Sequence, residues 1–306
     1  MSSNSRLFVM IVAAHVLQIG TVADAWAQAC CTGGLAVSPA RLAPTEDVLV
    51  GLQTRAMGNL GQWNARGDWQ PLPSGSRELS NQTDLVAAAR LKDWQFSARL
   101  PWIETLRQTV RAGQAIGGGF GDVDAGIRYD FRLVRQGWQG LGVAAIVGLT
   151  VPTGRPVERA QAAQAVDATG TGAWQPRAGM AVEGLLGPWL TQVSLGITQP
   201  STRQIADMAV RTGWQGAVGL AVARVWSRGI SSAFSLGYLR AADTKVSGVA
   251  IADSGHDAYN VGVSLSTWLG DWRVGMLASG TPPLSGVGHN QPVTAGMTLT
   301  ALRVWP

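Results

Sequence analysis

The sequence predicts an all-β protein: a transmembrane antiparallel up-and-down β-barrel of twelve strands. Three observations predict it. Segments in which apolar and polar residues alternate recur along the chain, the connections between them alternate between long and short, and tryptophans gather where the segments end. Charged residues make up only 14% of the 306-residue chain, against the usual quarter in a soluble domain.

The start of the chain has the features of a secretory signal peptide. Arg6 supplies a positive charge, residues 7–22 are mostly apolar, and Ala27-Gln28-Ala29 is a small-x-small cleavage motif. We therefore expect residues 1–29 to be removed on export and the protein to reside in the bacterial outer membrane. A transmembrane anchor is the alternative, but the cleavage motif directly after the apolar run favours a signal peptide.

Residues 30–46 are expected to form a periplasmic N-terminal segment, which either hangs free or tucks into the barrel. Cys30 and Cys31 are the two cysteines of the chain. Cys30 could be lipidated, although Ala27 stands where lipoproteins prefer a large aliphatic residue; a strained vicinal disulfide and an unmodified terminus also remain open. Two adjacent cysteines do not complete a metal site, and we predict no metal and no cofactor.

The clearest alternation covers residues 122–133, where Asp124, Arg128 and Asp130 point one way and Ile127 and Phe131 the other. The same pattern predicts strands at 47–56, 83–91, 94–102, 122–133, 141–151, 174–184, 189–198, 213–225, 231–240, 259–267, 272–279 and 294–305. Tilted transmembrane strands need about 9 to 11 residues, which these segments approach. Residues 47–306 are therefore assigned to the barrel.

The connections follow the plan of outer-membrane barrels, with short periplasmic turns and long extracellular loops. The short turns are expected at 92–93, 135–140, 185–188, 227–229 and 270–271, and the long loops at 57–82, 103–121, 152–173, 199–212, 241–258 and 280–293. The longest apolar run, 141–151, has 11 residues, whereas a spanning helix needs about 20. A closed barrel also satisfies every backbone group in lipid.

Ten tryptophans flank the turns or the loop ends of the strands and are expected to form two girdles in contact with outer-membrane lipid. They are Trp94, Trp102, Trp138, Trp174, Trp189, Trp214, Trp226, Trp268, Trp272 and Trp305. Core aromatics of a soluble β-protein would favour strand centres instead. The barrel-insertion machinery commonly reads a terminal aromatic residue; here Trp305 is penultimate and Pro306 follows it.

The inward positions of the early strands carry charge, whereas the later strands present glycine, alanine and serine. The expected lumen-lining residues are Arg55, Asp84, Arg90, Arg99, Asp122, Asp124, Arg128, Asp130, Arg132, Arg177 and Glu183. Two interpretations stay open: a polarised channel, or a structural network of paired charges that fills a narrow barrel. The formal charge of +5 is not clustered, which argues against a nucleic-acid partner.

A glycine-rich run ends in Gly119-Phe120-Gly121-Asp122, and a later strand ends in Pro152-Thr153-Gly154. A strand follows the first run, so it is not a phosphate-binding loop, which needs a helix. Together the two motifs resemble a family of outer-membrane barrels known as phenol-degradation meta-pathway proteins or as transporters. The resemblance implies a barrel that passes small apolar or aromatic compounds, and it carries over no catalytic residue.

These observations favour an outer-membrane channel or transporter for small solutes. The alternatives are a closed structural barrel whose loops bind a partner, and a barrel enzyme acting on lipid. For the last, the only histidines of the mature chain, His256 and His289, fall in expected loops rather than on an outward strand position beside a serine. We therefore predict that the protein is not an enzyme.

Overall fold

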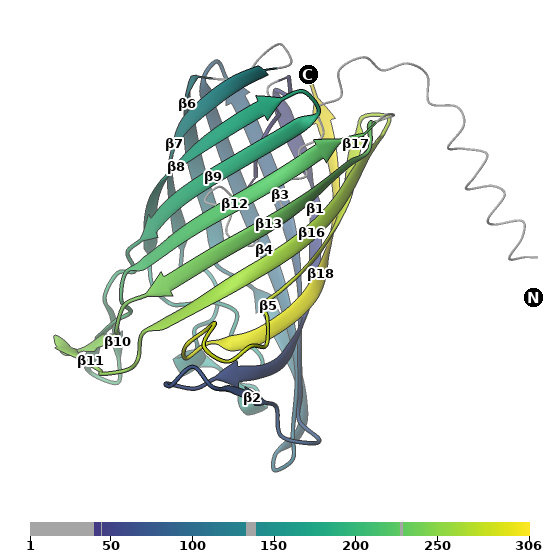
Figure 1. Cartoon of the computed structure of the whole chain (residues 1–306). Coiled ribbons are helices and arrows are strands. Elements are labelled where there is room, and N and C mark those ends of the chain that lie inside the picture. Colours follow the sequence, from purple (N-terminus) through teal and green to yellow (C-terminus); the bar gives the residue numbers. More distant parts are fainter. Residues whose placement is uncertain (1–39, 44, 133–138, 227–228) are drawn as a thin grey trace, which may run out of the picture.

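The chain closes into a ring of strands in the computed structural model, which describes residues 40–43, 45–132, 139–226 and 229–306 (Figure 1). The strands follow one another in the order β18-β17-β16-β13-β12-β9-β8-β7-β6-β4-β3-β1, every pair is antiparallel, and β1 pairs with β18 to close the ring. Closure leaves no strand edge exposed to lipid. The predicted antiparallel barrel of twelve strands is confirmed.

Each of the twelve predicted strand ranges overlaps one barrel strand. The strands are β1 (Val48–Trp63), β3 (Arg77–Leu91), β4 (Trp94–Thr109), β6 (Val123–Arg132), β7 (Gln139–Val151), β8 (Gln175–Leu186), β9 (Trp189–Thr198), β12 (Gln215–Val225), β13 (Ser231–Ala241), β16 (His256–Leu269), β17 (Trp272–Gly280) and β18 (Pro292–Trp305).

Four of the expected long loops contain strand, so these predicted ranges are wrong: 57–82 and 103–121 are largely strand, and 199–212 and 241–258 hold short strands. The strands β1, β3 and β4 continue beyond the neighbouring barrel strands, and β2 (Trp69–Pro71) and β5 (Gly113–Phe120) pair with these extensions. A pairing partner is available at every step, so the ladder of backbone hydrogen bonds continues past the predicted ends of the strands.

The alternation that predicts the strands is also visible in the exposure of their side chains. In β8 the outward residues Met180 and Val182 are exposed, whereas the inward residues Ala181 and Glu183 are buried. A soluble barrel would not expose large apolar side chains in this way along its whole wall, but a wall that faces lipid does.

The two ends of the barrel differ. At one end, which we term the short-turn end, tight turns such as 92–93 and 270–271 join the strands, and the C-terminus lies there (Figure 1). Lys92 and Gly270 both take a positive φ, as two-residue hairpin turns require. The expected turns at 135–140 and 227–229 fall mainly outside the described residues.

The opposite, long-loop end carries additional structure. Four short strands, β10 (Arg203–Ile205), β11 (Met208–Arg211), β14 (Lys245–Val246) and β15 (Val249–Ala250), form a small separate sheet. Two short 3-10 turns, η2 (Val157–Arg159) and η3 (Ala163–Ala165), lie in the loop between β7 and β8. Across the described ranges, no helix has the length and apolar character needed to cross a membrane.

Candidate channel interior

A row of alternating charges runs around one side of the inner wall, on five different strands. It consists of Arg55, Asp84, Arg99, Asp124 and Arg177, on β1, β3, β4, β6 and β8. Arg99 and Asp124 lie opposite each other in register, and Arg99 Nη2 donates to Asp124 Oδ2 at 3.2 Å. Arg177 donates to the other oxygen of Asp124. Arg55 Nη2 lies 3.9 Å from Asp84 Oδ2. We name these five residues the middle charge row.

A glycine makes space for the contact between Arg177 and Asp124. Gly148 on β7 lies opposite Arg177 in register, between β6 and β8. A Cβ atom at Gly148 would lie 2.6 Å from the guanidinium of Arg177, closer than side-chain atoms approach. The absence of a side chain there lets Arg177 cross β7 and reach Asp124, whose Oδ1 also accepts a hydrogen bond from Thr150 at 3.3 Å.

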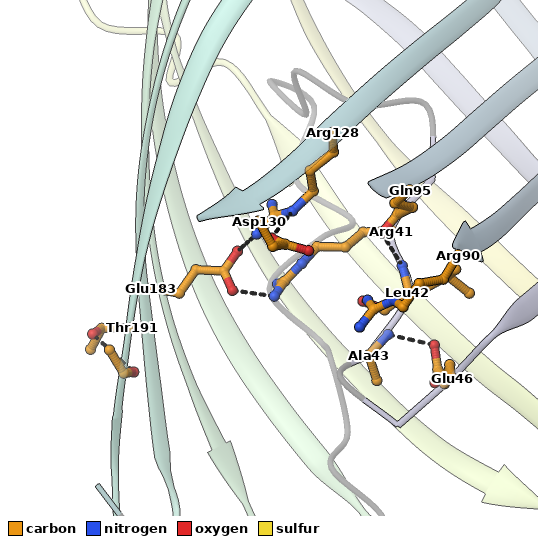
Figure 2. Close-up of polar contacts among 11 residues, drawn as sticks. Arg41, Leu42, Ala43, Glu46, Arg90, Gln95, Arg128, Asp130, Glu183 and Thr191 are labelled. Carbon is orange, nitrogen blue, oxygen red and sulfur yellow. Dashed lines mark hydrogen bonds and ion pairs between the residues drawn. The ribbon is translucent and has the colours of Figure 1, made fainter. Parts of the chain in front are cut away.

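A second group of charges lies nearer the short-turn end and is more deeply buried. Its members are Arg41, Arg128, Asp130 and Glu183 (Figure 2). Arg128 Nε donates to Asp130 at 2.7 Å, and Arg128 Nη2 donates to Glu183 Oε1 at 2.9 Å. Arg41, which precedes the first strand, binds the other oxygen of Glu183. Buried charges of this kind persist only when they are paired, and these four pair with one another.

The described residues just before β1, 40–43, 45 and 46, therefore lie inside the barrel. We call residues 40–46 the closing segment; the structure describes all of it except residue 44. The side-chain amide of Gln95 on β4 donates to the carbonyl of Ala40 at 2.7 Å and accepts from the backbone nitrogen of Leu42 at 3.1 Å. Arg90 donates to the Leu42 carbonyl at 3.3 Å. The described residues of the segment lie in the interior, and so they do not hang free in the periplasm.

Apolar contacts with the inner wall also hold the closing segment in place. Leu42 is only 1% exposed and packs in one cluster with Leu49, Val86 and Val304 from the inner faces of β1, β3 and β18. Burying a leucine side chain contributes about 1.5 to 3 kcal/mol. The segment is thus held by packing as well as by ion pairs.

The far end of the closing segment reaches a different part of the wall. Arg273 Nη1 on β17 donates to both carboxylate oxygens of Glu46, at 2.8 and 3.1 Å, and Glu46 also accepts from the Ala43 backbone at 2.6 Å. Around the ring of twelve, β17 is five strands from β8 in one direction and seven in the other. Because Arg41 binds β8 and Glu46 binds β17, the segment crosses the interior between nearly opposite walls.

Trp268 belongs to this region, and its predicted place in a lipid-facing girdle is wrong. It is half-buried, packs against the cluster around Leu42, and lies 5.9 Å from the guanidinium of Arg273. Ser264 and Ser266 precede it on the same face of β16, so the alternation indicates an inward position for Trp268. Its position beside a short turn instead suggested a place in the girdle.

The other girdle candidates that the structure describes lie on the outside. Their exposures run from 38% to 48%, and they are Trp94, Trp102, Trp174, Trp189, Trp214, Trp226, Trp272 and Trp305. Trp138 lies outside the described residues. Contact of the eight with the membrane interface stays a prediction.

Two of the expected lumen residues do not belong to the charged interior that the structure describes. Asp122 lies just before β6, where its carboxylate accepts from the Gly154 backbone at 2.9 Å and from the Thr171 backbone at 2.7 Å. It therefore ties down the loop at 152–173 instead of lining the lumen, because the strand begins one residue later. The side chain of Arg132 lies outside the described residues.

The remaining wall, formed by β9, β12, β13, β16 and β17, presents mainly small side chains, with Arg273 and Trp268 as exceptions. Ala223 is fully buried, and Ser231 and Ser266 are hydrogen-bonded at 2.8 Å across β13 and β16. Gly219 faces Ser194, with 2.6 Å between the Ser194 hydroxyl and the place of a Cβ atom. One side of the interior is thus charged, and the other consists mainly of small residues but also holds Arg273 and Trp268.

Neither histidine of the described chain is arranged as a catalytic base beside a serine. His289 pairs through its backbone with Asp257 and through its ring with the Ala65 carbonyl. Ser254, the serine nearest His256 in sequence, donates to the Ile251 carbonyl at 2.6 Å within its own loop. Over the described ranges, no group of three or more His, Cys, Asp or Glu residues is placed to hold a metal ion.

Comparisons with known proteins show the class of fold. No family model and no curated protein matches the chain. Among solved structures, an outer membrane channel from Pseudomonas putida F1 is similar over 87% of this chain and 97% of its own, with a TM-score of 0.69 and 15% identity. The transport unit of the autotransporter AIDA-I from Escherichia coli covers 98% and 97%, with a TM-score of 0.48 and 8% identity.

A KdgM porin, solved with disordered oligogalacturonate, covers 84% of this chain and all of its own, with a TM-score of 0.43 and 8% identity. Of these three, only the Pseudomonas putida channel has a TM-score above 0.5, and at 15% identity its likeness to this chain concerns the fold alone. The fold is that of an outer-membrane β-barrel.

Proposed function

We propose that the protein is an outer-membrane channel for small solutes, closed at its periplasmic end by residues 40–46 in the form seen here. The observation that carries the proposal is the closing segment itself. Arg41 and Glu46 hold it across the interior through Glu183 and Arg273, on nearly opposite strands. A segment held across the interior in this way can close a passage through the barrel.

The proposal fixes an orientation. In outer-membrane barrels the short turns face the periplasm and the long loops face outward. The closing segment is seated among residues next to short turns, such as Arg90, Gln95 and Arg273, and so it occupies the periplasmic mouth. In this proposal outer-membrane lipid surrounds the apolar outer wall. The insertion machinery recognises β18, whose last residue is Trp305.

The two-sided interior suggests which solutes would pass. The middle charge row supplies arginines that can attract an anionic group, and the facing wall of glycine, alanine and serine leaves room for an apolar body. A small aromatic carboxylate has both features. This agrees with the aromatic compounds that the family resemblance implies, and it makes a neutral sugar a poorer solute.

Proteoliposome swelling tests the proposal. Vesicles are loaded with the double variant Arg41→Ala/Glu46→Ala, which releases the closing segment, and are challenged with iso-osmotic benzoate, benzyl alcohol or arabinose. Because benzyl alcohol crosses lipid unaided, empty vesicles set the background for each solute. The expected result is swelling above background that is faster for benzoate than for arabinose. A folded double variant that gives no swelling above background with any solute would favour the closed structural barrel.

A further inference from the structure

A pocket lies at the long-loop end, between β5 and the loop that joins β7 to β8. Its volume is about 440 Å³, within the range of small-molecule sites. The side chains and glycines that matter for its chemistry are Gly118, Phe120, Arg155, Arg159, Gln161 and Asp167.

One edge of β5 has no strand as a partner among the described residues. Among the described strands β5 pairs only with β4, so its second edge faces the loop at 152–169 instead of another strand. Gly118 and Gly119 line the pocket on this edge, and no side chain of theirs fills it. Phe120 follows them and is 58% exposed, which gives the pocket one apolar surface.

The facing loop is held rigidly before any ligand arrives. The Asp167 carboxylate accepts from the backbone nitrogens of Gln161 and Ala162 at 2.9 and 3.0 Å and binds the Arg155 guanidinium. Thr169 joins the two walls, since its hydroxyl donates to the Phe120 carbonyl at 2.6 Å. A preformed site loses little entropy when it binds.

The pocket carries an excess of positive charge. Asp167 is the one carboxylate among its lining residues, against the guanidiniums of Arg155 and Arg159. The Arg155 side chain remains 45% exposed although it is paired. The Arg159 side chain makes no hydrogen bond or ion pair within the described chain, and the nearby Glu158 is engaged by Arg203 at 2.9 Å.

We propose that this pocket binds a small organic anion, a carboxylate or phosphate attached to a compact apolar body. Arg159 and Arg155 would hold the anionic group, Gln161 would donate a further hydrogen bond, and the body would lie against Phe120. The anion could be a dissolved solute or the phosphate of an outer-leaflet lipid headgroup. Capture of a solute ahead of transport rests on the proposed channel function, but binding as such does not.

Binding of phenyl phosphate by the refolded full chain in detergent, followed by titration calorimetry, tests the proposal. The key variant is Arg159→Gln, and the matched control is Arg111→Gln, an exposed arginine at the tip of the β4–β5 hairpin. Charge-assisted hydrogen bonds to an anion are worth about 1.5 to 3 kcal/mol, so Arg159→Gln is expected to weaken binding about tenfold or more. Arg111→Gln should leave it unchanged.

Two further arms complete the test. Benzyl alcohol, which has the ring without the charge, should bind at least tenfold more weakly than phenyl phosphate. Micelles doped with phosphorylated or dephosphorylated lipid A separate the two sources: a preference for the phosphorylated form that Arg159→Gln removes, with no binding of phenyl phosphate, would assign the site to lipid and overturn solute capture.

Equal affinity of the wild type and Arg159→Gln for every anionic probe would overturn the site altogether. Since the readout is binding and not conductance, that failure would leave the proposed channel function untouched. Heat-modifiable migration on a gel shows in each case that the variant is folded.

Discussion

Arg41 and Glu183 form a buried ion pair between residues that stand 142 positions apart in the sequence. Glu183 also accepts from Arg128, so its single carboxylate binds two guanidiniums from two parts of the chain, and Asp130 supplies the second negative charge. The pair joins the closing segment to β8, and with the pairing of Glu46 and Arg273 it defines how the segment is held. Most of what the structure predicts about function depends on these two anchors.

Replacing Glu183 with glutamine should destabilise the barrel markedly. The change keeps the shape but leaves Arg41 and Arg128 as buried cations that have lost a charged partner, which costs about 3 to 5 kcal/mol in comparable sites. Urea unfolding of the refolded protein in detergent measures it. Asp207→Asn, at an exposed loop position, is the control, and equal stability of the two variants would show that the Glu183 pairs contribute little.

Gly148→Ala should disturb the middle charge row. The added methyl group would lie 2.6 Å from the Arg177 guanidinium and would push it away from Asp124. Overpacking of this kind costs about 1 to 3 kcal/mol. Gly58→Ala is the matched control, because the nearest atom to its Cβ position is 3.5 Å away. If both variants unfold at the same urea concentration, Arg177 adjusts without loss.

Arg273→Ala should expose the peptide bond between Arg41 and Leu42 to trypsin. Without Arg273, Glu46 loses both hydrogen bonds that fix the segment to β17, and the buried bond becomes accessible. N-terminal sequencing of the digest would detect a new terminus at Leu42. Arg303→Ala, on the outer face of β18, serves as the control and should remain uncut at this bond. Protection in Arg273→Ala would mean that the remaining contacts, which are the packing of Leu42, the Arg41–Glu183 pair and the hydrogen bonds to Gln95, retain the segment.

The loop at 152–169 should stay docked down to low pH. The hydrogen bond from the Gln161 backbone, supported by Arg155 and the Ala162 backbone, lowers the pKa of Asp167 from 3.8 to about 2. The carboxylate therefore stabilises the loop fully above pH 3.8, and this contribution is lost as the pH falls through about 2. Carboxyl NMR titration of Asp167, assigned with Asp167→Asn, checks it; a midpoint near 3.8 would contradict the contacts described.

Alternation could predict the barrel because each strand has a lipid face and an inner face, which the sequence must keep chemically distinct. It could not predict that β4 continues to Thr109, because outside the membrane neither face has to be apolar and backbone pairing alone extends the strand. The sequence does not decide whether the closing segment lies in the lumen or in the periplasm, since residues 40–46 carry no periodic pattern. Their partners, such as Gln95 and Arg273, lie far away along the chain.

For the charged residues too, alternation predicts the direction of each side chain but not its partner. The inward direction of Arg99 and Asp124 follows from counting by twos along their strands, and so does the inward direction of Trp268 once its serine neighbours are counted. Their pairing depends on register between strands, which the sequence does not reveal. Asp122 shows the limit of counting, because one residue at a strand end decides between the lumen and a loop.

If the closing segment blocks a channel, its release should raise the conductance of the barrel. Single-channel recording in planar bilayers measures this conductance. Wild-type protein is compared with Arg41→Ala/Glu46→Ala, and Arg66→Ala, an exposed loop change, is the control. We expect rare or small conductance steps for the wild type and the control, and frequent, larger steps for the double variant. Silence from a double variant shown to be folded, or steps as large from the wild type, would contradict it.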